Sequence, residues 1–134
     1  MAISNSEHLA RFLKSEGWFN QGQVKGEAFR PRKDRGALRT SVIRHNGTNP
    51  DEIKRSGNAW KEMPRRPTPV NFLGWADVMV GAVRTISTIP SLDVEEAGSK
   101  GNPHHANIVG WNLYEGQHMI QAEEVAQQST LVLI

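Results

Sequence analysis

The fold is decided by the stretch Leu38-Arg39-Thr40-Ser41-Val42-Ile43-Arg44. Successive side chains of an extended chain point to opposite faces, so residues 38, 40 and 42 share one face and residues 39, 41 and 43 share the other. A polar turn precedes this stretch at Arg32-Lys33-Asp34-Arg35-Gly36, and a short strand is expected before that turn, over Gln23 to Phe29. Together these segments predict an antiparallel hairpin with a basic tip.

Helices are expected at three places outside this hairpin. Ser4 and Glu7 have the spacing of a capping box, and Leu9, Phe12 and Leu13 follow at helical spacing until Gly17. Asn49 and Pro50 are typical of a helix N-terminus, although Gly57 is a possible interruption of that helix. The segment Gln117 to Gln128 predicts an amphipathic helix near the C-terminus.

The rest of the chain is expected to form short strands and loops. Asn71 to Ile89 fits both strand and helix spacing, and we favour a strand over Asp77 to Ile86 because β-branched residues dominate there. Pro64, Pro67 and Pro69 predict an extended linker. Further strands are expected at Leu92 to Glu95, Ala106 to Trp111 and Thr130 to Ile134, with a loop at Gly98 to Pro103.

These elements predict one α+β domain over residues 1–134. We expect a mostly antiparallel or mixed sheet of about five to six strands with two or three helices. The length of 134 residues is enough to bury a core without disulfides, and the chain has no cysteine. Thiol catalysis and cysteine-ligated metal sites are therefore excluded, and a reducing compartment is favoured.

The N-terminal residues lack the apolar run of an export signal, and no stretch is long enough to cross a bilayer. The sequence therefore predicts a cytoplasmic protein that does not bind membranes.

Charge is distributed unevenly along the chain. Residues 25–66 hold 12 Lys and Arg against 5 Asp and Glu, whereas residues 67–134 hold 2 against 7. Such asymmetry is typical of a surface for an anionic partner. The alternative is that the two segments pack together and neutralise each other, and the sequence leaves both open.

The basic segment supplies the candidate binding residues, and three functions are compatible with it. The first is a non-catalytic accessory module that contacts an acidic protein partner. The second is a nucleic-acid-binding module that uses the same residues. The third is a small enzyme for a phosphorylated or nucleotide substrate, in which Arg30 would hold phosphate and His105 would act as acid or base. The candidates are Arg30, Arg32, Lys33, Arg35, Arg39, Arg44, Lys54, Arg55, Arg65 and Arg66.

Other chemistry has weaker support in the sequence. A zinc site from His45, His104 and His105 lacks any H-x-x-x-H or H-E-x-x-H spacing, so no metal and no cofactor is predicted. Ser41 has no G-x-S-x-G context that would mark it as a nucleophile. His104 and His105 are neighbours on an extended segment and point to opposite faces, so at most one of them faces a given site.

Three short motifs resemble those of a group of small bacterial proteins that share an A-F-R/K-x-P strand, an L-S-V strand and an H-A-x-I-x-G strand. The motifs here are Glu27-Ala28-Phe29-Arg30-Pro31, Ser41-Val42 and His105-Ala106-Asn107-Ile108-Val109-Gly110. The chain departs from the pattern because Arg39 and Thr40 separate Leu38 from Ser41. The resemblance implies a fold and no activity, and it favours Arg30 and His105 over their neighbours as site residues.

Overall fold

The computed structural model describes residues 3–62 and 71–134. Within them, a sheet of seven strands has the order β7-β8-β5-β1-β6-β9, with β4 paired to β5, and β2 and β3 form a separate ribbon. All pairings are antiparallel. The strands are β1 His8–Leu13, β2 Phe19–Asn20, β3 Gln23–Val24, β4 Arg32–Asp34, β5 Ala37–His45, β6 Gly74–Met79, β7 Asp93–Glu96, β8 His105–Val109 and β9 Thr130–Leu133.

Three α-helices and two short 3-10 helices complete the described elements, and the α+β prediction is confirmed. They are η1 Glu16–Trp18, η2 Gly26–Phe29, α1 Pro50–Lys61, α2 Val80–Arg84 and α3 Glu115–Gln127. The sheet has one strand more than the upper end of the expected range. Among the residues described, no helix combines the length and the apolar character that a membrane crossing requires.

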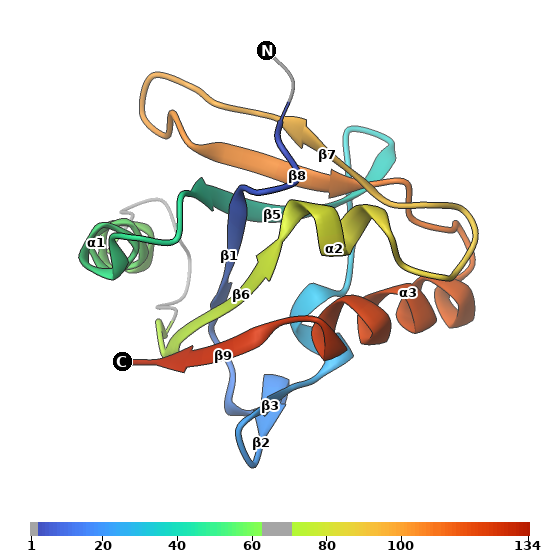
Figure 1. Cartoon of the computed structure of the whole chain (residues 1–134), viewed down its shortest axis with the longest axis horizontal. Coiled ribbons are helices and arrows are strands. Elements are labelled where there is room, and N and C mark those ends of the chain that lie inside the picture. Colours follow the sequence, from blue (N-terminus) through green and yellow to red (C-terminus); the bar gives the residue numbers. More distant parts are fainter. Residues whose placement is uncertain (1–2, 63–70) are drawn as a thin grey trace.

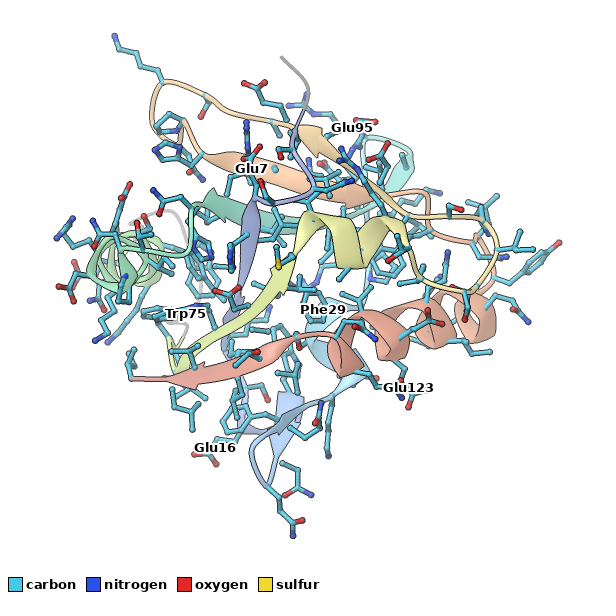
Figure 2. All side chains as sticks on the ribbon, viewed as in Figure 1. Glu7, Glu16, Phe29, Trp75, Glu95 and Glu123 are labelled. Atoms are coloured by element: carbon cyan, nitrogen blue, oxygen red, sulfur yellow. The ribbon has the colours of Figure 1, made fainter. Side chains whose placement is uncertain are left out.

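Helices cover both faces of the sheet, with α2 and α3 on one side and α1 on the other (Figure 1). The larger core lies under α2 and α3 and includes Leu9, Phe29 and Val125. The smaller core lies under α1 and contains Ala10, Ile43, Ile53, Phe72 and Trp75. Figure 2 shows Phe29 on the side of the sheet toward α3 and Trp75 on the side toward α1.

The helix expected after Ser4 is wrong, because residues 8–13 form the central strand β1. Leu9 and Leu13 face the larger core, whereas Ala10 faces the smaller one. A strand that is covered on both faces has no simple alternation, and its apolar residues then mimic helical spacing. Ser4 and Glu7 do contact each other as a capping box would, at 2.9 Å from Ser4 N to Glu7 Oε2, but in a turn that leads into the strand.

The hairpin is confirmed, but its first strand is shorter and later than expected. Residues 23–29 form β3 and η2 rather than one strand, and β4 begins only at Arg32. Arg35 and Gly36 both adopt positive φ, at 51° and 83°, which is the two-residue turn that joins twisted strands. The predicted faces of β5 are confirmed, since Thr40 and Val42 are buried on the face of the larger core and Ile43 is buried on the face of the smaller core.

Residues 71–89 contain a strand and a helix, where one strand over Asp77 to Ile86 was expected. The strand β6 ends at Met79 and α2 begins at Val80. Val80 and Val83 are fully buried at helical spacing, so their packing against the core decides the conformation over β propensity. The strands predicted near β7, β8 and β9 and the helix predicted near α3 are confirmed within a few residues. The linker predicted from Pro64, Pro67 and Pro69 lies outside the described residues.

The helix α1 runs through Gly57 without interruption, so the expected break is absent. Asn49 caps it as predicted, by accepting a hydrogen bond from Glu52 N at 3.2 Å. Gly57 faces Phe72, and a Cβ at this position would lie 2.1 Å from a ring carbon of Phe72. Glycine is therefore required for the close approach of α1 to the sheet.

We expect Gly57→Ala to destabilise the protein by about 1 to 3 kcal/mol, because the added methyl group overpacks against Phe72. In an exposed helix the same change would stabilise by about 1 kcal/mol. Asn58→Ala, at the exposed neighbouring position, is the matched control and should be neutral or slightly stabilising. Urea unfolding measures both, and a stabilised Gly57→Ala variant would contradict the contact.

Candidate functional site

The described basic residues of segment 25–66 do not gather on one surface. Arg32, Lys33 and Arg35 lie in or beside β4 at the tip of the hairpin, and Lys54 and Arg55 lie on α1. The hairpin tip and α1 are at opposite ends of β5 (Figure 1). Arg65 and Arg66 lie outside the described residues. The structure thus separates the described candidates into at least two groups.

Three of the predicted arginines already contact carboxylates. Arg30 pairs with Glu115 at the start of α3 and also lies 3.6 Å from Glu27.

Arg44 donates to both carboxylate oxygens of Glu7, at 2.8 and 3.2 Å. This hydrogen bonding from Arg44 is the largest cause of the lowered pKa of Glu7. Arg39 lies 3.9 Å from Asp34 within its own hairpin. These three guanidinium groups are therefore partly neutralised before any partner arrives.

Arg11 of β1, which was not among the predicted residues, differs from these arginines because its hydrogen bonds go to backbone carbonyl groups. Its Nε donates to Ala28 O at 2.8 Å and its Nη1 donates to Ser41 O at 3.0 Å. Its guanidinium carbon lies 5.4 Å from the ring centroid of Trp18. The pairing of β1 with β5 ends at Ala10 and Ile43, so Arg11 satisfies carbonyl groups where the two strands separate.

Arg11 has no carboxylate partner among the described residues. Its neighbours are carbonyl oxygens and an aromatic ring, and its Nη2 donates no hydrogen bond within that part of the chain. Burial, together with the smaller effect of the nearby charge of Arg32, lowers the pKa of Arg11 to about 10. The guanidinium group remains protonated at neutral pH, and none of the described carboxylates forms an ion pair with this half-buried charge.

Arg11 lines a cavity of about 320 Å³, and the other residues that line it are Trp18, Glu27, Arg30, Pro31 and Arg32. Three of these six side chains are arginines and only one is acidic. Because Arg30 is paired with Glu27 and Glu115, the excess positive charge of the cavity comes from Arg11 and Arg32. A guanidinium pair of this kind suits a carboxylate or a phosphate group.

His105 and Ser41 form a second polar contact, on the other side of the sheet. His105 Nε2 lies 2.6 Å from Ser41 Oγ, since β5 and β8 are paired with Ser41 opposite Asn107. Ser41 also lines a cavity of about 500 Å³ between the sheet and α1. The contact between Ser41 and His105 could not be predicted from the sequence, because only the pairing of β5 with β8 brings the two residues together.

Arg30 and His105, the predicted enzymatic pair, do not share a site. Ala106 and Ile108 of β8 belong to the core under α3, so alternation places His105 on the face toward α1. Arg30 instead contacts Glu115 of α3.

The three histidines considered for zinc are likewise not brought together. His104 lies 3.8 Å from Glu52 and His105 contacts Ser41, whereas His45 meets His8 and Asp77.

Asp77 lies between His8 and His45. The distances are 2.7 Å from His8 Nδ1 to Asp77 Oδ1 and 3.1 Å from His45 Nε2 to Asp77 Oδ2. Burial by itself raises the pKa of Asp77, but the contacts with His45 and His8 outweigh it and the pKa is lowered. Asp77 is therefore a carboxylate at neutral pH. This cluster was not predicted, because the segment that contains His8 was expected to be a helix.

Comparison with known proteins gives no relative: no family model, no curated protein and no solved structure matches this chain. Functional inference therefore depends on the contacts and charges of its own residues.

We expect inorganic phosphate to raise the melting temperature by a few degrees over chloride at equal ionic strength, because an anion between Arg11 and Arg32 binds the folded state only. Arg32→Gln should reduce this increment to less than half. Lys33→Gln removes the same charge from the neighbouring residue, which does not line the cavity, and should leave the increment intact. An equal loss in both variants, measured by thermal melts, would indicate general screening instead.

We expect Ser41 to stay unmodified by a fluorophosphonate probe, as measured by mass spectrometry of the intact protein and its peptides. Within the described residues, no hydrogen bond holds His105 Nδ1, so nothing orients the imidazole or stabilises its cation as a triad carboxylate does. Stoichiometric labelling that is lost in His105→Ala would contradict this and would mark the pair as an activated nucleophile.

Proposed function

We propose that this chain is a non-catalytic accessory module of the cytoplasm that binds a protein partner, by receiving an acidic side chain of that partner between Arg11 and Arg32. The observation that carries the proposal is the half-buried Arg11 guanidinium, which forms no ion pair with any carboxylate in the described structure. A carboxylate that enters the cavity would meet the unused Nη2 edge of Arg11 and the side chain of Arg32.

A protein partner is favoured over nucleic acid by the arrangement of the cations. Nucleic acid presents a line of phosphates, and binding strength depends on how many cations contact it at once. The described basic residues lie at opposite ends of β5, and three of them are paired with carboxylates. An isolated carboxylate, by contrast, needs only one pair of guanidinium groups.

The enzymatic alternative receives less support from the geometry. It requires Arg30 and His105 to contact one substrate, yet Arg30 contacts α3 and His105 lies on the face of the sheet toward α1. A binding role requires no such convergence.

Fluorescence anisotropy with two labelled probes tests the proposal. The probes are a hexaglutamate peptide and a single-stranded oligothymidylate that carries the same number of charges. We expect saturable binding of the peptide that weakens as salt is raised, and weaker binding of the oligonucleotide. Tighter binding of the oligonucleotide would favour the nucleic-acid function, and no binding of either probe at low salt would reject both.

Matched variants locate the binding site. Arg32→Gln should weaken peptide binding by about 5- to 30-fold, which corresponds to about 1 to 2 kcal/mol for one charge-assisted contact. Lys54→Gln on α1 makes the same change in net charge and should leave the affinity unchanged. If both variants lose affinity equally, attraction is diffuse and the cavity is not the site.

A further inference from the structure

The side chains of His8, His45 and Asp77 come from three adjacent strands at the centre of the sheet. His8 of β1 is paired with His45 of β5, and β6 supplies Asp77 opposite Ala10 of β1. All three lie on the face that α1 covers, next to the buried Ala10, Ile43 and Trp75. Neighbouring strands hold their side chains about 5 Å apart, so this convergence is built into the register.

The spacing of the three groups matches that of metal ligands. One ring nitrogen of each histidine and one carboxylate oxygen of Asp77 lie within 4.8 Å of one another. Bonds of about 2.0 to 2.2 Å to a central ion place ligand atoms roughly 3.3 Å apart, so only small side-chain movements are needed. Two imidazoles and one carboxylate are ligands that suit zinc and neighbouring divalent transition metals.

One buried nitrogen of the cluster lacks a hydrogen bond. His45 Nε2 is buried and makes no hydrogen bond within the described structure, although Asp77 Oδ2 is only 3.1 Å away. The 3.1 Å distance is that of an ion pair. A buried polar atom without a partner is unfavourable, and coordination of an ion would satisfy it.

The turn after β5 leaves room for this arrangement. Gly47 has a φ of 83°, and a Cβ at Gly47 would lie 2.7 Å from His8 Nε2. Any other residue would therefore push the His8 ring out of the cluster. His45 also lines a cavity of about 320 Å³ between the end of β5 and the start of α1.

From these observations we propose that His8, His45 and Asp77 form a binding site for one divalent transition-metal ion of the zinc class. The ion takes His8 Nδ1, His45 Nε2 and a carboxylate oxygen of Asp77. Three protein ligands leave at least one position of a tetrahedral ion for water. This inference is independent of the anion cavity at Arg11, because neither set of residues contributes to the other.

Metal binding has a local cost at His45. Its Nδ1 accepts a hydrogen bond from Gly47 N at 3.0 Å, so the neutral ring carries its proton on Nε2. When Nε2 binds an ion, the proton moves to Nδ1 and the hydrogen bond from Gly47 is lost. The Gly47 amide is therefore a reporter of occupancy that lies outside the ligand set.

Titration of the untagged, chelator-treated full chain with Co²⁺ tests the site, since Co²⁺ in a protein site has a visible absorption spectrum and Zn²⁺ can displace it. We expect one Co²⁺ per chain, displaced by Zn²⁺, with an affinity at least tenfold weaker in His8→Gln and in Asp77→Asn. His104→Gln removes a more exposed histidine near the same cavity and should change nothing. Absence of saturable binding, or equal loss in all three variants, would overturn the proposal.

A second measurement on the wild-type chain keeps the test decisive if a variant fails to fold. Addition of Zn²⁺ should shift the ring signals of His8 and His45 and the amide signal of Gly47, as recorded by nuclear magnetic resonance. The signals of His104 and His118 should not move. Shifts confined to exposed histidines would mean adventitious surface binding and would reject the site.

Discussion

The structure depends on the burial of one six-residue strand, β1, between two cores. Its Leu9 and Leu13 are completely inaccessible on the side of α2 and α3, and its Ala10 is buried on the side of α1. The strand also pairs with β5 on one edge and β6 on the other. Both helical layers therefore pack on the same short segment, and every candidate site described above has a residue on β1 or on a strand that pairs with it.

The sequence predicts well those elements whose signals are local. The start of α1 follows from Asn49 and Pro50, whose capping and φ preferences act within one turn. The faces of β5 follow from alternation, because each face meets a different environment. By contrast, β1 was mistaken for a helix because both of its faces are apolar, and Val80 and Val83 form helix α2 because of the core that surrounds them, against their β propensity.

The candidate sites were less predictable because they depend on the pairing of distant strands. His8 and Arg11 fall in a segment that was expected to be a helix, whereas they lie on the central strand β1. Ser41 and His105 meet only because β5 pairs with β8. The basic segment illustrates the converse: residues that are close in sequence, such as Arg35 and Lys54, are separated by the length of β5. Charge along a chain is thus a poor guide to charge on a surface.

The position of β1 also bears on how the chain acquires its fold. Its two neighbours are β5 at residues 37–45 and β6 at residues 74–79, so β1 is synthesised before either of the strands that pair with its edges. Pairing strands that are so far apart in sequence slows folding relative to helical proteins of similar size. Until the pairing is complete, the apolar strand β1 stays exposed. The polypeptide therefore has to complete β6 before its centre is protected from association with other nascent chains.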